Sequence, residues 1–438
     1  MKREKNPRVA FYTLGCKLNY AETEALAQRM RENGYEVVDF KDNADYYVIN
    51  TCSVTQQAEK KCRQAINKLN NSFTTPNIAL IGCYAQLASS KLASLSGVNI
   101  VLGTQDKFTL PTHIGNHLGN NDTTPEVHSC AIDQVHEFDA AFTQAGRTRS
   151  FLKVQDGCNY HCAYCTIPLA RGESRNPRID SLKQQAEKIA DAGIQEIVLT
   201  GVNIGDFGRT TNETMLDLLK TLEQVEGIER IRVSSVEPNL MTSDIIDFMA
   251  QSHKYLPHFH IPLQSGSDTI LKAMQRRYNT QIFQNKIEEI KAKIPNAFIG
   301  VDVIVGFPGE TDALFEEAYR FMKALPVSFY HVFSYSDRPN TRSIDLPNKV
   351  APKIIQKRSK IINELAAEKQ RAFYESQLKT KEVVLFEKAN KNEWMHGYTR
   401  NYIKVETPYQ QELVGAIRTV MLKEITPSGD VKIDMLTK

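Results

Sequence analysis

Cys158-Asn159-Tyr160-His161-Cys162-Ala163-Tyr164-Cys165 brings three thiols into a short loop directly after Phe151–Gln155, which we predict to be a strand. Three thiolates this close in sequence can bind one metal centre, and three ligands leave one iron of a [4Fe–4S] cubane open to a substrate. Zinc, with His161 as a fourth ligand, is the alternative, because structural zinc sites close with four ligands. These residues, called the loop cysteines below, predict a metal-binding loop at the carboxyl end of a strand.

The segment around this loop, residues 148–370, repeatedly alternates a strand with an amphipathic helix. Six such units are too few for an eight-stranded barrel, so we predict a partial (β/α)6 barrel. A long basic helix is predicted near its end, over Ala351–Tyr374. The predicted strands are Phe151–Gln155, Glu196–Thr200, Arg230–Ser234, His258–Leu263, Phe298–Ile304 and Ser328–Phe333, and the helices include Ser181–Ala192, Met215–Val225, Thr242–Gln251 and Leu314–Lys323.

The flanking segments have other patterns. Residues 7–140 alternate strands with helices, which indicates a parallel sheet covered on both faces. Residues 371–438 show short strands punctuated by turn residues, which indicates a small antiparallel β-barrel. The predicted fold class is therefore α/β, with these two units on either side of the partial barrel. The predicted elements are strands Val9–Thr13, Tyr46–Asn50, Ile78–Gly82, Glu382–Phe386, Tyr398–Glu406 and Leu413–Ile425, helices Ala21–Asn33, Ala58–Asn70 and one from Gln86, and a loop His113–Pro125.

Composition excludes several classes of protein. The 438 residues carry 54 Lys and Arg against 51 Asp and Glu, and the net charge of +3 excludes a histone-like or strongly acidic protein. No apolar run approaches the ~18 residues that span a bilayer, and no apolar signal region follows the N-terminus. We therefore expect a cytoplasmic protein that contacts no membrane. Cytosolic thiols stay reduced, so the eight cysteines are expected to serve a metal or catalysis rather than disulfides.

Three further cysteines, Cys16, Cys52 and Cys83, each follow a predicted strand of the first segment. The carboxyl ends of neighbouring parallel strands share one edge of the sheet, where α/β folds bind ligands. We therefore predict that these strand-end cysteines meet and hold a second cluster with an open iron, although each alone is more often a small buried residue. Cys62, on a predicted helix, and Cys130, after a polar loop, are predicted not to be ligands.

The C-x3-C-x2-C spacing, with an aromatic residue before the last cysteine, resembles that of the radical S-adenosylmethionine superfamily. The resemblance implies that the open iron binds the amino and carboxylate groups of S-adenosylmethionine. It also implies cofactor-binding segments at the ends of later strands, although polar strand ends and turns explain each segment equally well. The residues expected to contact the cofactor are Tyr164, Thr200, Gly201, Asn203, Ser234, Glu237, Gln264, Ser265, Asp302, Val305, Gly306 and Phe307.

Two cysteine sets together with a small C-terminal barrel resemble the methylthiotransferase family over nearly the whole chain. Thr13–Asn19 and Leu199–Gly208 are most similar to the enzymes that act on N6-threonylcarbamoyladenosine in tRNA, whereas His260–Ser267 is shared more widely. The resemblance implies a methylthiotransferase domain over 7–140, a radical S-adenosylmethionine core over 148–370, and a TRAM domain, which is a nucleic-acid-binding barrel, over 371–438.

The activity implied by this resemblance is methylthiolation of carbon 2 of the adenosine at position 37, beside the anticodon. That C–H bond is not acidic, so a radical route is needed. Two [4Fe–4S] clusters are implied: one on the loop cysteines cleaves S-adenosylmethionine, and one on the strand-end cysteines holds the sulfur that is methylated. The alternatives are isopentenyladenosine in tRNA, an aspartate of a ribosomal protein, and a non-catalytic RNA-binding protein with metal sites.

The expected partners are the anticodon stem-loop of tRNA and an electron donor such as flavodoxin or ferredoxin, and we expect a monomer. Arg171, Arg175 and Arg178 follow the loop cysteines and are predicted to contact RNA phosphates. Aromatic and basic residues on or near the small barrel are predicted to stack on unpaired bases, or else to be ordinary strand and surface residues. They are Tyr398, Tyr402 and Tyr409 with Arg400 and Lys404.

Overall fold

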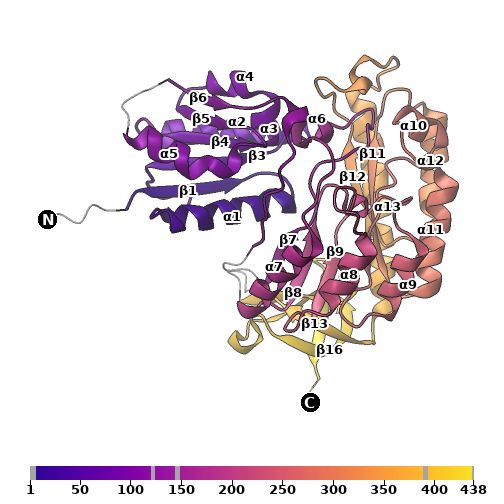
Figure 1. Cartoon of the computed structure of the whole chain (residues 1–438). Helices are drawn as coiled ribbons and strands as arrows, with labels where there is room; N and C mark the ends of the chain where they lie inside the picture. Colours follow the sequence, from indigo (N-terminus) through magenta and orange to yellow (C-terminus); the bar gives the residue numbers. More distant parts are fainter. Residues whose placement is uncertain (1–5, 120–123, 144–147, 388–392, 437–438) are drawn as a thin grey trace.

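The computed structural model describes residues 6–119, 124–143, 148–387 and 393–436. Figure 1 shows an N-terminal α/β unit beside a curved array of central strands with helices outside it, and a C-terminal barrel at one end of that array. The predicted α/β fold class is confirmed, because parallel sheets precede a closed five-stranded barrel. The limits of the three domains stay predictions. No helix within the described ranges is long and apolar enough to cross a membrane.

The N-terminal unit is a six-stranded parallel sheet in the order β2-β1-β3-β4-β5-β6. Alternate strand residues face opposite sides, so Val48 joins a core with α1 and α5, whereas Ile49 joins one with α2. The elements are β1 (Arg8–Thr13), α1 (Lys17–Glu32), β2 (Glu36–Val38), β3 (Tyr46–Thr51), α2 (Gln56–Ser72), β4 (Ile78–Gly82), α3 (Cys83–Leu87), α4 (Ser89–Ala93), β5 (Val98–Leu102), α5 (Leu110–Gly119) and β6 (Glu126–His128).

Two predictions for this unit are wrong. The expected loop His113–Pro125 instead begins within α5, because Leu110 and Ile114, one turn apart, bury their side chains against the sheet. Burial of that apolar face outweighs the weak helix propensity of the glycine and asparagine around it. The helix expected from Gln86 begins at Cys83, immediately after β4.

The central unit contains two three-stranded parallel sheets, β7-β8-β9 and β10-β11-β12. Parallel bridges from Ile231 to Tyr255 and from Ser235 to His260 join them into the six-stranded partial barrel that the sequence predicts. Its elements are β7 (Arg149–Lys153), α6 (Ile167–Arg171), α7 (Ile179–Asp191), β8 (Glu196–Thr200), α8 (Met215–Glu223), β9 (Arg230–Val233), α9 (Ser243–Gln251), β10 (His258–His260), α10 (Asp268–Ala273), α11 (Thr280–Lys293), β11 (Phe298–Val305), α12 (Asp312–Ala324) and β12 (Phe329–Ser334).

The long helix α13 (Pro352–Gln377) leads into a closed barrel, β13-β14-β15-β17-β16. The expected strand Tyr398–Glu406 is two strands, because the Thr399 hydroxyl donates to Asn401 Oδ1 and Tyr402 adopts a φ of 68°, which makes a turn. One pairing, β15 with β17, is parallel, so the barrel is not wholly antiparallel. Its strands are β13 (Lys381–Phe386), β14 (Trp394–Thr399), β15 (Lys404–Pro408), β16 (Ile417–Ile425) and β17 (Val431–Met435).

Candidate functional site

The loop cysteines lie between β7 and α6, and backbone amides point at two of their sulfur atoms. The Tyr160 N–H donates to Cys158 Sγ at 3.3 Å. The Ile167 N–H donates to Cys165 Sγ at 3.4 Å. Hydrogen bonds to sulfur stabilise the thiolate form and tune the reduction potential of an iron–sulfur cluster. The fold of the loop itself therefore prepares these two thiols to bind metal.

The third loop cysteine has a side-chain partner that sequence reasoning missed. Arg276 donates Nη1–H to Cys162 Sγ at 3.0 Å and to the Tyr164 hydroxyl at 3.4 Å. Its other amino group pairs with Glu237 and donates to the Tyr278 hydroxyl. Burial raises the pKa of Glu237, and Arg276 opposes that shift. In sequence, the pair Arg276-Arg277 resembles any exposed basic pair, so no signal distinguishes it.

The protonation of the thiols bears on how they bind a metal. Burial raises the pKa of Cys158, Cys165 and Cys52 to about 12, so without metal these thiols keep their protons at neutral pH. A coordinated metal ion removes such protons. The thiols would therefore bind a metal as thiolates, as they do in iron–sulfur clusters and in zinc sites.

The strand-end cysteines follow three adjacent strands, as predicted. Cys16 caps the start of α1 after β1, Cys52 follows β3, and Cys83 begins α3 after β4. The sheet order places these strands side by side. Burial is the main cause that raises the pKa of Cys52. The neighbouring thiols Cys83 and Cys16 raise it further, so these two cysteines lie close enough to Cys52 to interact with it electrostatically.

Gly15 allows the close approach of the first two of these residues. It adopts a φ of 102°, and a Cβ placed on it would lie 2.8 Å from the Cβ of Cys52. The left-handed conformation and the lack of space both require glycine here. Cys16 is exposed, whereas Cys52 and Cys83 are buried, so the set opens to solvent on the side of Cys16. Cys62 lies on α2, where its side chain is buried in the core between this helix and the sheet.

A buried group of charges, the Glu22 ion cluster, joins the N-terminal sheet to the central barrel. It consists of Glu22, Lys107, Lys153, Asp156 and Arg171, and each of these side chains is at most 2% exposed. Arg171 Nη1 lies 2.9 Å from a carboxylate oxygen of both Glu22 and Asp156. Burial opposes the ionisation of Glu22, but Arg171, Lys107 and Lys153 together lower its pKa.

The Glu22 ion cluster also reaches the strand-end cysteines. Arg171 donates Nε–H to Cys83 Sγ at 3.3 Å and Nη2–H to Asn19 Oδ1 at 2.7 Å. Sequence reasoning missed Glu22, although its position four residues before Leu26 puts a carboxylate on the apolar face of α1. A charge on such a face signals a buried partner, because an isolated buried carboxylate is too costly.

The prediction that Arg171 and Arg175 contact RNA phosphates is wrong. Arg171 is 1% exposed and Arg175 is 6% exposed. Arg175 Nη2 lies 3.1 Å from Asp156 Oδ2. Both guanidinium groups are therefore paired inside the protein. Arg178, just before α7, is exposed, and its contact with RNA stays a prediction.

A cavity lies beside Cys165, where the N-terminal and central units meet. Thr166 Oγ1 donates to the Ser53 carbonyl at 3.4 Å, so the loop that carries Cys165 touches the residue after Cys52. The cavity is lined by residues from both units, including Val54, Thr55, Tyr164, Cys165, Gln264, Asp302 and Arg338. Three of the residues predicted to bind the cofactor, Tyr164, Gln264 and Asp302, are among them.

The other predicted cofactor residues lie at the ends of the central strands. Both amide atoms of Asn203 and the hydroxyl of Ser234 are buried without a hydrogen-bond partner within the described ranges. Buried polar atoms of this kind are costly unless a ligand or water satisfies them. Asp302 bonds to His260 at 2.8 Å, and Phe307 packs edge-on against Tyr164. Thr200 and Ser265 are buried, and Gly201, Val305 and Gly306 belong to the same strand ends.

Aromatic residues of the C-terminal barrel face the central unit. Tyr398 stacks on Tyr402 with ring centroids 4.9 Å apart. Arg149 and Arg232 lie 4.9 and 4.7 Å from these two rings, respectively. The prediction of base stacking is therefore wrong for Tyr398 and Tyr402, whose faces already have partners. Tyr409 is 41% exposed, and its contact with RNA stays a prediction.

The two cations predicted beside these rings have partners of their own. Lys404 pairs with Asp430 at 2.7 Å, and Arg400 donates to the carbonyl of His253 at 2.6 Å. Arg400 thus helps dock the small barrel on the central unit instead of standing free for a phosphate.

Two regions of the chain match known protein families. Residues 8–103 match the uncharacterized protein family UPF0004, and residues 152–322 match the radical SAM superfamily. Among solved structures, the radical S-adenosylmethionine methyltransferase TsrM from Kitasatospora setae superposes with a TM-score of 0.57 and 12% identity, covering 77% of both chains. This likeness concerns the fold alone.

Relatives resemble the chain over almost its full length. It is 38% identical to the threonylcarbamoyladenosine tRNA methylthiotransferase MtaB of Bacillus subtilis, covering 94% of this chain and 93% of the relative. The Aquifex aeolicus protein of the same name is 37% identical, covering 94% of this chain and 100% of the relative. A tRNA-2-methylthio-N(6)-dimethylallyladenosine synthase of Clostridium botulinum is 31% identical, covering 87% of this chain and 86% of the relative.

Proposed function

Because the chain belongs to the methylthiotransferase family of radical S-adenosylmethionine enzymes, we propose that it methylthiolates carbon 2 of N6-threonylcarbamoyladenosine at position 37 of tRNA. The enzyme uses S-adenosylmethionine and two [4Fe–4S] clusters. The relatives at 37–38% identity are named for the threonylcarbamoyl substrate, whereas the dimethylallyl relative is 31% identical. This difference favours the threonylcarbamoyl substrate over its isopentenyl counterpart.

The loop cysteines would hold one cluster and the strand-end cysteines the other. Two observations support this assignment: the N–H donors aimed at the sulfurs of Cys158, Cys162 and Cys165, and the arginine bonded to Cys83. The observation that carries the proposal is a cavity lined by Cys165 of the central unit and by Thr55, which follows closely after Cys52 in the N-terminal unit. A cavity lined by both units suits a reaction that needs both a radical and a sulfur.

The residues around the cavity would bind and orient the reactants. S-adenosylmethionine, when bound, supplies the radical that removes hydrogen from carbon 2. Asn203 and Ser234 offer unsatisfied buried polar atoms to its polar groups. Tyr164 and Phe307 supply apolar walls that exclude water from a reactive species. Thr200, Gly201, Glu237, Gln264, Ser265, Asp302, Val305 and Gly306 are proposed to complete the cofactor site.

The remaining proposals concern the cellular setting. A flavodoxin or ferredoxin would supply electrons, because cleavage of the cofactor is reductive. The protein would act as a monomer in the cytoplasm, where tRNA is used. The anticodon stem-loop would enter over the cavity, with Arg178 and Tyr409 as exposed contacts.

Nucleoside analysis tests the substrate. Deleting the gene should remove the methylthio mark from N6-threonylcarbamoyladenosine in tRNA, as measured by mass spectrometry, and leave methylthio-isopentenyladenosine unchanged. Loss of the mark from isopentenyladenosine, or from an aspartate of a ribosomal protein, would contradict the proposal. A tRNA and ribosomal protein pool with every mark intact would favour the non-catalytic alternative.

A further inference from the structure

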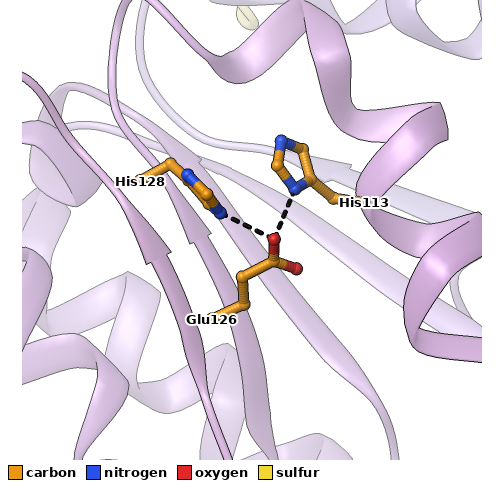
Figure 2. Close-up of side chains that lie close together, drawn as sticks. All are labelled: His113, Glu126 and His128. Atoms are coloured by element: carbon orange, nitrogen blue, oxygen red, sulfur yellow. Dashed lines mark hydrogen bonds and ion pairs between the residues drawn. The ribbon is translucent and has the colours of Figure 1, made fainter. Parts of the chain in front are cut away.

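A second kind of metal-binding group lies in the N-terminal unit and contains no cysteine. His113 on α5 and Glu126 and His128 on β6 place one donor atom each within 4.8 Å of one another. Figure 2 shows the two imidazole rings converging on one oxygen of the Glu126 carboxylate. His113 Nδ1 and His128 Nε2 lie 2.7 and 2.6 Å from that oxygen. We call this group the His-Glu-His triad.

We propose that the His-Glu-His triad binds a divalent transition-metal ion of the zinc type. Two imidazole nitrogens and one carboxylate oxygen form a ligand set that zinc uses with its fourth position open. Calcium and magnesium prefer all-oxygen sites, so they fit this donor set poorly. The inference does not rest on the proposed activity, because none of the three residues lies in either cysteine set or lines the cavity between them.

The surroundings of His113 fit a metal-bound imidazole. A ring that binds metal through Nδ1 carries its proton on Nε2, and such rings usually donate that proton to a neighbouring oxygen. His113 Nε2 lies 3.1 Å from the hydroxyl of Thr109, one turn earlier. Thr109 therefore holds the ring in place, and its hydroxyl can accept a proton on Nε2 when a metal ion replaces the proton on Nδ1.

The charge balance also fits a cation. His113 and His128 both contact the Glu126 carboxylate, at 2.7 and 2.6 Å. Among the described residues, no lysine or arginine forms an ion pair with Glu126. A second possible metal-binding group, around Asp430, differs in this respect, because Lys404 already pairs with that carboxylate at 2.7 Å. Within the described ranges, the His-Glu-His triad thus presents a carboxylate that has no lysine or arginine partner.

The position of the triad indicates its role. β6 has three residues and, among the described strands, pairs with β5 alone, so it is the edge strand of the sheet. A short edge strand is held by few hydrogen bonds. A metal ion shared by His113 and the two β6 residues would fasten that strand to α5, which packs on the sheet through Ile114. Metal binding at this point would stabilise the native N-terminal unit, because a ligand that binds only the folded state shifts the folding equilibrium.

The test uses the full chain with both iron–sulfur clusters loaded without oxygen, so that the cluster cysteines are already occupied. One equivalent of Zn²⁺ is added, and zinc K-edge X-ray absorption reports its ligands. We expect nitrogen and oxygen ligands at about 2.0–2.2 Å and no sulfur at about 2.3 Å. We also expect zinc to raise the thermal midpoint of the protein. No bound zinc, or zinc bound by sulfur, would overturn the proposal.

Variants locate the site. His128→Ala should abolish binding of this zinc ion, and Thr109→Val should weaken it about 10- to 100-fold, as loss of an outer hydrogen bond to a metal ligand does. Glu126→Gln should also lose the zinc. Because this substitution keeps the size of the side chain, it tests the site even if the alanine variant misfolds. His136→Ala, at an exposed histidine of the same unit, is the matched control and should bind normally. Equal zinc affinity in His128→Ala, Glu126→Gln and the control would refute the site.

Discussion

The Nε–H of Arg171 points at the Sγ of Cys83 from 3.3 Å, so a buried guanidinium on the central unit contacts a thiol at the edge of the N-terminal sheet. The same guanidinium lies 2.9 Å from oxygens of Glu22 and Asp156. One side chain therefore ties a strand-end cysteine, α1 and the segment after β7 together. This contact sets the position of one cysteine set relative to the other.

Arg171→Met should destabilise the protein by about 3–5 kcal/mol, because removing one partner of a buried ion pair leaves uncompensated charge. The free energy of unfolding of the cluster-loaded protein, from anaerobic urea denaturation, measures the effect. Arg178→Met, at an exposed arginine seven residues later, is the control and should change stability by less than about 0.5 kcal/mol. Equal effects of the two substitutions would contradict the structural role of Arg171.

The lowered pKa of Glu22 leads us to expect that the protein loses stability in acid. Burial alone would raise its pKa, but Arg171, Lys107 and Lys153 lower it below the ordinary value of 4.5. A carboxyl group whose folded-state pKa is depressed stabilises the fold above its unfolded pKa, and this contribution is lost as the pH falls. The thermal midpoint of the wild type should therefore fall as the pH drops from about 5 toward 3.

Glu22→Gln should be less stable at pH 7 and should lose less stability over that acid range. Asp156, whose pKa is also well below its ordinary value, leaves part of the acid sensitivity in the variant. Glu32→Gln, on the exposed end of α1, should follow the wild-type curve. A Glu22→Gln curve parallel to that of the wild type would count against the charge pairing.

Gly15→Ala should disrupt the strand-end cysteines while sparing the loop cysteines. The new Cβ would meet Cys52 Cβ at 2.8 Å, and Gly15 has a φ of 102°. Gly34→Ala is a matched control, because Gly34 has a φ of 84° with nothing within 4 Å of the new Cβ, so it carries the backbone strain without the clash. We expect Gly15→Ala to lose methylthio product and about half its iron, yet still produce 5′-deoxyadenosine. Full product formation in this variant would show that the close approach is unnecessary.

Arg276 should raise the reduction potential of the cluster that we assign to the loop cysteines. Its Nη1–H donates to Cys162 Sγ at 3.0 Å, and hydrogen bonds to cluster sulfurs tune the potential. A nearby positive charge favours the reduced, more negative state. Arg276→Gln should therefore lower the potential, as followed by an electron paramagnetic resonance titration, and Arg276→Lys should lower it less. An unchanged potential in Arg276→Gln, with normal iron content, would contradict this assignment.

The sequence predicts those parts of the molecule in which local pattern and tertiary packing agree. Glu196–Thr200 and Ile78–Gly82 each contain a short run of apolar residues, and the structure has strands with the same limits. The sequence also predicts the placement of Cys16, Cys52 and Cys83 at one edge of the sheet. Parallel strands bring their carboxyl ends to the same edge, however far apart they lie along the chain. These predictions depend only on strand order and direction.

The misses come from contacts between distant segments. In sequence, Arg171 and Arg175 resemble cations that bind RNA. In the structure Arg171 pairs with Glu22, 149 residues away, and Arg175 pairs with Asp156, both inside the protein. α5 forms because Leu110 and Ile114 pack on the sheet, despite the polar residues around them. The turn after Thr399 contains neither glycine nor proline, so only the folded structure reveals it.

Iron content tests the central claim that two sets of three cysteines each hold one cluster. The anaerobically reconstituted wild type should contain about eight irons per chain, as two [4Fe–4S] clusters require. Replacing Cys158, Cys162 and Cys165 with alanine should leave about four irons and abolish 5′-deoxyadenosine, whereas replacing Cys16, Cys52 and Cys83 should leave about four irons and retain it. Four irons in the wild type, or zinc in either set, would contradict the account.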